Sequence, residues 1–124
     1  MSGICLAAGT SAVRLALTAF TLAWTHTVEQ LLWEEDWRVE RAGLVLVESR
    51  VRGSGAGMEP GPEARLEGAA FRSTPALPPL PELVLARAPG LPDWRLCAPD
   101  GCRPLGALLP GSEGPVVLRP CPDP

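Results

Sequence analysis

The sequence predicts an all-β fold: a single domain, residues 1–124, built as an antiparallel sandwich or partly open barrel of about seven to nine short strands. Two observations favour this fold. The chain contains 15 prolines and 13 glycines among 124 residues, more than a helical domain tolerates and suited to short strands joined by turns. Apolar and polar residues also alternate with a period of two along much of the chain, as in half-buried strands.

The alternating segments predict the strands in chain order. Phe20–Val51 is expected to form three strands in an antiparallel meander, the last of which, Leu44–Val51, follows a turn at Ala42-Gly43. As a central strand it should not accept proline at Val47, because proline cannot donate to the ladder. Cys5 and Cys121 are placed in the first and last strands. The other expected strands are Val13–Ala19, Ala64–Arg72, Glu82–Ala88, Asp93–Ala98, Cys102–Leu105 and Val116–Arg119.

Two segments interrupt this pattern. Gly53–Pro62 holds four glycines and two prolines and is expected to be a loop. Ser73–Pro81 holds four prolines and should be extended at the surface. Helical turns are expected only within Val28–Leu32 and Pro104–Leu109.

Charge and hydropathy narrow the classes of partner. The net charge of −3 argues against a nucleic-acid binder, since phosphate contacts need a basic surface. The apolar run Ala12–Trp24 is too short and too polar for a transmembrane segment, and no signal peptide is recognised. The chain as written is therefore expected in the cytoplasm, or in the periplasm if its true start lies upstream.

The four cysteines are candidates for two disulfides. Cys97 and Cys102 face each other across a hairpin with a turn at Pro99-Asp100-Gly101, and Cys5 with Cys121 would close most of the chain. One alternative is a single four-thiolate zinc site, although zinc ribbons use two short Cys-x-x-Cys knuckles. Reduced, buried cysteines are a further alternative in a cytoplasmic protein.

The segment Trp24–Val39 is the leading candidate for a site. It reads WTHTVEQLLWEEDWRV and contains the only histidine, three of the four tryptophans and four carboxylates. His26 and Glu29 could bind a metal or act as a general base, but a structural hydrogen bond between His26 and a neighbouring acid is the favoured interpretation. We expect one binding patch, composed of His26, Thr27, Glu29, Glu34, Glu35, Gly55, Gly57 and Met58.

Simpler roles are available for the other features. Glu34 and Asp36 share a strand face, about 7 Å apart as in some glycosidases, but ion pairs with Arg38, Arg50 and Arg52 are favoured. The loop Gly53–Met58 could bind an anion through its amides, although a structural turn is favoured. The tryptophans are interpreted as core and rim packing. No catalytic residue is assigned.

The motifs resemble the small bacterial proteins known as domain of unknown function DUF 1850. Members show a Thr/Tyr-x-His-Ser-Val-Glu stretch, an acid-rich strand and a Gly-Ala-Gly-Met/Leu loop. Here Thr25–Glu29 matches the first motif with Thr27 in place of serine, Glu34–Asp36 the second and Gly55–Met58 the third. A tryptophan-rich segment of many members is replaced by Gly68–Phe71.

The resemblance implies a fold and a context but no activity. Genes of this family often neighbour TAXI-type TRAP transporters, so a permease or solute receptor is the expected partner. We therefore expect a non-enzymatic accessory or binding module, without cofactor or bound metal. The alternatives are a metal-binding protein, using the four cysteines or His26 with carboxylates, and an unrecognised hydrolase.

Overall fold

The computed structural model describes residues 3–26, 31–52, 65–67 and 70–121. These residues form eleven strands and one four-residue helix, so the all-β prediction is confirmed. The strands outnumber the expected seven to nine because several have only three or four residues. The elements are β1 (Gly3–Ala8), β2 (Ser11–Leu15), β3 (Ala19–His26), β4 (Leu31–Glu40), β5 (Gly43–Arg52), β6 (Arg65–Glu67), β7 (Ala70–Ser73), β8 (Leu83–Leu85), β9 (Arg95–Ala98), β10 (Gly101–Pro104), α1 (Leu105–Leu108) and β11 (Val116–Cys121).

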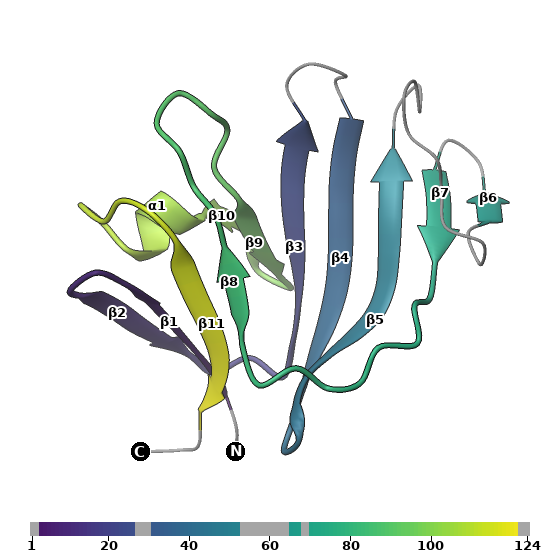
Figure 1. The fold of residues 1–124 in the computed structure, drawn as a ribbon, viewed down its shortest axis with the longest axis horizontal. Coiled ribbons are helices and arrows are strands. Elements are labelled where there is room, and N and C mark those ends of the chain that lie inside the picture. The colour runs from purple at the N-terminus through teal and green to yellow at the C-terminus, as the bar shows by residue number, and fades with distance from the viewer. Residues whose placement is uncertain (1–2, 27–30, 53–64, 68–69, 122–124) are drawn as a thin grey trace.

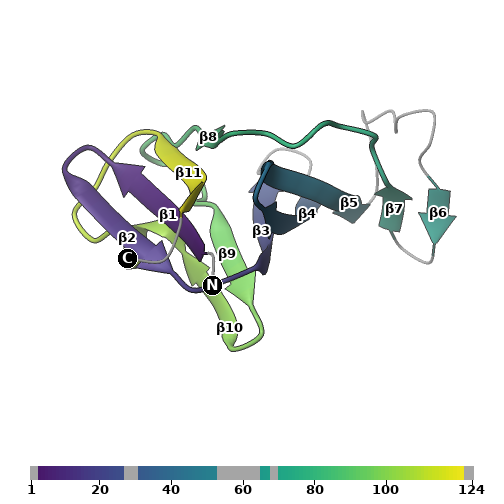
Figure 2. The same cartoon turned by 90° about the horizontal axis from the view of Figure 1, so that it is seen from below.

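The strands form two antiparallel sheets that face each other without closing into a barrel (Figure 1). The small sheet has the order β2-β1-β11-β8, and the large sheet has the order β10-β9-β3-β4-β5-β7-β6. Viewed from below, β7 and β6 extend away from the small sheet (Figure 2). The large sheet is therefore only partly covered by the small one. No described helix is long and apolar enough to cross a membrane.

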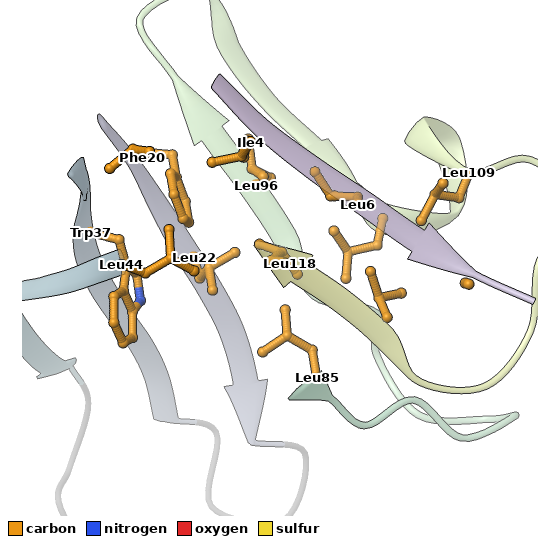
Figure 3. Packing of buried hydrophobic residues seen from close by; sticks show 14 residues of the cluster. Ile4, Leu6, Phe20, Leu22, Trp37, Leu44, Leu85, Leu96, Leu109 and Leu118 are labelled. Atoms are coloured by element: carbon orange, nitrogen blue, oxygen red, sulfur yellow. The ribbon is translucent and has the colours of Figure 1, made fainter. Parts of the chain in front are cut away.

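The core lies between the sheets and is built from the apolar positions of the alternating strands (Figure 3). The large sheet contributes Leu22 on β3 and Leu44 on β5, which are fully buried. The small sheet contributes Ile4 and Leu118, which are also fully buried. Alternate residues of a strand point to opposite faces, so one face of each strand supplies this core. The core residues are Ile4, Leu6, Ala8, Phe20, Leu22, Trp37, Val39, Leu44, Leu85, Leu96, Leu105, Leu109, Val116 and Leu118.

The predicted meander is confirmed, since β3 pairs with β4 and β4 pairs with β5, both antiparallel. Leu22, Trp37 and Leu44 are buried together as expected, whereas Trp24 is only half-buried. The expectation for proline at Val47 stays a prediction, but the regular ladder on which it rests is interrupted there. The register slips between Asp36 and Trp37, which leaves Val47 outside the pairing and 42% exposed.

Two other strand predictions need correction. The alternation over Val13–Ala19 does not form one strand, because β2 ends at Leu15 and β3 begins at Ala19. Ala64–Arg72 is also divided, since Arg65–Glu67 pairs antiparallel with Ala70–Arg72. Val13–Ala19 alternates throughout, but alternation does not report where the chain reverses. The helical turn expected within Pro104–Leu109 is confirmed as α1.

Both predicted disulfides are present. Cys97 and Cys102 are directly opposed in the β9–β10 hairpin, with their Cα atoms 3.9 Å apart. Cys5 on β1 is bonded to Cys121 on β11, with a Cα separation of 5.8 Å. The cysteines therefore pair separately, and the alternative of one four-thiolate zinc site is wrong.

Gly43 shows why the turn before β5 requires glycine. Its φ is +141°, and a Cβ there would lie 2.5 Å from the carbonyl oxygen of Leu80. That close approach permits two hydrogen bonds, from Leu44 N to Leu80 O at 2.7 Å and from Leu80 N to Leu44 O at 2.9 Å. The chain before β8 is thereby tethered to the start of β5.

We expect Gly43→Ala to lower the free energy of unfolding by about 2–3 kcal/mol, from backbone strain and weakened tethering hydrogen bonds. The matched control is Gly101→Ala, because Gly101 has a φ of +129° but no atom within 4 Å of its Cβ position. Gly101→Ala should lower the free energy of unfolding by about 1 kcal/mol, from backbone strain alone. Urea unfolding of both variants measures the difference, and equal losses would contradict the steric explanation.

Candidate functional site

The acidic stretch of β4 is divided between the two faces of the large sheet. Glu34 and Asp36 lie on the face that turns away from the core, and Glu35 lies on the face that carries Leu22 and Trp37. This alternation separates three consecutive acids into two environments. Each environment has its own chemistry.

On the outer face, Arg50 of β5 joins three acids. Its Nη1 and Nη2 donate to both carboxylate oxygens of Asp36, at 2.6 and 2.8 Å. Nη1 also lies 2.6 Å from Glu48, and Nε lies 3.4 Å from Glu34. Arg52 donates to Glu34 at 2.7 Å. The cross-strand pairing of Arg50 and Arg52 with the acids is as predicted, whereas Arg38 pairs with Glu40.

These contacts lower the pKa of both Asp36 and Glu34. The hydrogen bonds from Arg50 hold the pKa of Asp36 below its ordinary value of 3.8 against the opposing effect of burial, and Thr21 Oγ1 adds a bond at 2.7 Å. Burial tends to raise the pKa of Glu34, but the hydrogen bonds from Arg52 and Arg50 outweigh it and the pKa is lowered. Both acids are therefore stabilised as anions, as expected of structural ion pairs.

The pKa of Glu35 is shifted in the opposite direction. Burial raises its pKa above the ordinary value of 4.5, and a hydrogen bond from Trp37 Nε1 at 3.3 Å opposes this effect. Among the described residues, no arginine forms an ion pair with it. A carboxylate buried in this way is destabilised unless another group compensates for the lost water.

Glu35 lines a groove with a volume of about 470 Å³, which is within the size range of small-molecule sites. One side of the groove is the end of the β3–β4 pair, where Trp24 and Trp33 are directly opposed. The other side is the connection between β8 and β9, which rises beside β3 in Figure 1. The lining residues are Trp24, Trp33, Glu35, Ala86, Arg87, Ala88, Leu91, Pro92 and Trp94.

Trp94 connects the two sides of the groove. Its ring stacks on Trp24, with centroids 6.0 Å apart and an interplanar angle of 28°. Its Nε1 donates to Ala86 O at 3.1 Å, and its own carbonyl accepts from Leu105 N at 2.9 Å. Trp94 immediately precedes β9, which pairs with β3 and carries the disulfide to β10. The ring is thus held by the sheet as well as by its loop.

Two polar groups of the groove have contrasting environments. Arg87 donates from Nε to Gly114 O at 2.7 Å and from Nη2 to Ser112 Oγ at 2.9 Å, so the loop before β11 holds its head group. Trp33 Nε1 is buried and has no acceptor within the described structure. Burying an unsatisfied donor costs free energy, and functional sites are common places for such groups.

The structure describes only part of the predicted binding patch. Glu34 and Glu35 lie on opposite faces of β4. The backbone of His26 ends β3 opposite Leu31, but its side chain is not described. The other members of the patch lie outside the described residues: Thr27, Glu29, Gly55, Gly57 and Met58. Among the described residues, no cluster of histidine, cysteine or acidic side chains is arranged for a metal ion.

Sequence reasoning missed the groove because its tryptophans come from distant segments. Trp24 and Trp33 belong to the acidic segment that was singled out, but Trp94 follows them by more than sixty residues. One signal for the groove was present in the sequence. Alternation places Trp33 and Glu35 on one face of their strand, and the antiparallel pairing of the meander places Trp24 on the same face of the sheet.

The comparisons with known proteins identify a family. No curated protein and no solved structure matches the chain significantly. The family model described as Domain of unknown function (DUF1850) matches residues 20–105, which run from the second residue of β3 through β10 and leave out β1, β2 and β11. This match covers more than half of the chain and includes the tryptophans of the groove. The chain therefore belongs to the family of proteins that contain the domain of unknown function DUF1850.

Proposed function

We propose that this protein is a non-enzymatic binding module that holds part of a ligand or partner protein in the groove of Trp24, Trp33 and Trp94. The observation that supports this proposal best is the assembly of three tryptophans around an open hollow that also contains a partly buried acid. Apolar hollows with a few converging polar groups are the usual form of small-molecule sites. Exposed tryptophan rings also anchor protein partners.

The proposal extends to a role beside a TRAP-type transporter, as permease accessory or receptor partner. Its support is the family resemblance in the His26, Glu34–Asp36 and Gly55–Met58 motifs. Two disulfides add support for an oxidising compartment, because structural disulfides persist in the periplasm or outside the cell. His26 ends β3 two residues after Trp24, so the family motif and the groove are neighbours in the chain.

The groove can be tested by NMR of the indole N–H groups, with choline and its uncharged isostere 3,3-dimethylbutan-1-ol as probes. We expect at least one probe to shift the signals of Trp24, Trp33 and Trp94 at millimolar concentration. The backbone N–H signal of Leu6 is an internal control, since Leu6 is fully buried in the small sheet and does not line the groove. Trp94→Ala should weaken this binding about fivefold, the effect of one aromatic contact.

The result that would contradict the proposal is equally specific. If neither probe shifts the three groove signals, or if the signal of Leu6 shifts with them, the groove is not a binding site for groups of this size. Co-purification of the wild-type protein with the neighbouring permease, lost in Trp94→Ala, tests the transporter role separately.

A further inference from the structure

Glu35 differs from the other described acids of the large sheet in its lack of a cation. Glu34, Asp36 and Glu48 each accept a hydrogen bond from an arginine at 2.9 Å or less. Glu35 accepts from Trp37 alone among the described residues. An indole N–H supplies one hydrogen bond but no compensating charge. The negative charge of Glu35 is therefore directed into the groove without a positive counterpart from the described chain.

The surroundings of Glu35 are suited to a cation. The face of a tryptophan ring is the most attractive aromatic surface for a positive charge, and the groove is lined by three such residues. Trp24 and Trp94 stack at the side of the groove, and Trp33 lies two residues before Glu35 on the same strand face. A carboxylate and three indoles therefore line one hollow.

Arg87 is the other charged side chain in the lining. Its Nε and Nη2 are directed to Gly114 O and Ser112 Oγ, as described above, and it forms no ion pair with Glu35 among the described residues. Arg87 consequently fixes the β8–β9 connection against the loop before β11. It does not neutralise the acid by direct contact.

We propose that the groove binds an organic cation of the alkylated ammonium class, with the charged group against the tryptophan rings and paired with the carboxylate of Glu35. This inference rests on the proposed function and names the ligand class of the same site. A trimethylammonium group suits the groove better than a primary ammonium. Its charge is spread over methyl groups that lose little hydration and contact the apolar rings directly.

The test compares choline with 3,3-dimethylbutan-1-ol, which has nearly the same shape and no charge. Calorimetric titration of the wild-type protein should show choline binding at least about tenfold more tightly, because a charged contact is stronger than a neutral one. Glu35→Gln should reduce that preference severalfold, since only the attraction of the tryptophan rings remains, and should leave the affinity for the alcohol unchanged. The matched control is Glu34→Gln, an adjacent residue on the opposite face, which should leave both affinities unchanged.

The stability of the same two variants gives an independent readout. A carboxylate whose pKa is raised by burial costs stability at neutral pH, so Glu35→Gln should raise the melting temperature. Glu34→Gln should lower it, because the pKa of Glu34 is lowered in the folded protein. Loss of stability in Glu35→Gln would show that the chain itself compensates the carboxylate, and the cation proposal would then fail.

The outcomes separate this inference from the proposed function. Equal binding of choline and the alcohol to the wild-type groove would overturn the cation class and leave the groove as a binding site. Absence of binding by both probes would overturn both proposals. The comparison of probes uses only the wild-type protein, so it does not depend on the folding of any variant.

Discussion

Replacing Cys5 and Cys121 together with serine should lower the free energy of unfolding by about 5 kcal/mol. The bond joins residues 116 positions apart, so it restricts nearly the whole unfolded chain. The entropy removed from the unfolded state grows with the length of the closed loop. In the folded state the same bond links β1 to β11, which are already paired in the small sheet. The effect should therefore come mainly from the unfolded chain.

The matched control is the double serine variant at Cys97 and Cys102. That bond closes a loop across only 5 positions, and the same relation gives about 2 kcal/mol. Urea unfolding at neutral pH, with oxidised wild-type protein as reference, measures both losses. A larger loss for the hairpin bond than for the terminal bond would contradict the loop-entropy explanation. It would indicate instead that the hairpin bond holds Trp94 and β9 in place.

Local sequence patterns were sufficient to predict the strands that pair with their neighbours along the chain. The turn at Pro99-Asp100-Gly101 sets the register that places Cys97 opposite Cys102, and the alternation of Phe20–Val51 is enough for a three-stranded meander. The bulge at Val47 was missed because Leu44–Val51 was treated as one regular strand. An extra residue moves the following side chains to the other face, so Leu44 and Leu46 face the core whereas Glu48 and Arg50 face outward.

The candidate site was only partly predictable for a related reason. Period-two alternation places Glu34 and Asp36 on one face, where they pair with Arg50 and Arg52 of β5. It also separates Glu35 from them, but it does not reveal what Glu35 faces. That depends on Trp94 and Arg87, which arrive through the connection of β8 in one sheet to β9 in the other. Contacts between sheets depend on the order of the strands, and strand order is not encoded in any single strand.

The two faces of β4 now suggest different roles for similar residues. On the outer face each acid has an arginine, and the pKa of Asp36 and of Glu34 is lowered. On the inner face Glu35 has the opposite shift and lies among tryptophans. Groups that reduce stability in isolation are common at binding sites, where a ligand supplies the missing partner. The outer face should accordingly respond to mutation through stability and the inner face through binding.

Arg50→Met should lower the free energy of unfolding by about 3 kcal/mol at neutral pH. The Arg50 side chain is 11% exposed and bridges Asp36, Glu48 and Glu34, so its removal leaves carboxylates close together without their shared cation. Methionine keeps much of the apolar length of the side chain, which limits the loss of packing. Arg38→Met is the matched control, because the Arg38–Glu40 pair is exposed and should contribute less than about 1 kcal/mol.

The loss caused by Arg50→Met should also depend on pH in a defined direction. Because the folded pKa of Asp36 and of Glu34 is lowered, their contribution to stability is present above their unfolded values of 3.8 and 4.5. It disappears as the pH falls through the lower folded values, where both acids become protonated in either state. Unfolding of wild-type and variant protein from pH 7 down to about pH 2 should therefore show two stability curves that converge. A difference that stays constant over this range would mean that Arg50 stabilises the sheet through packing rather than through its charge.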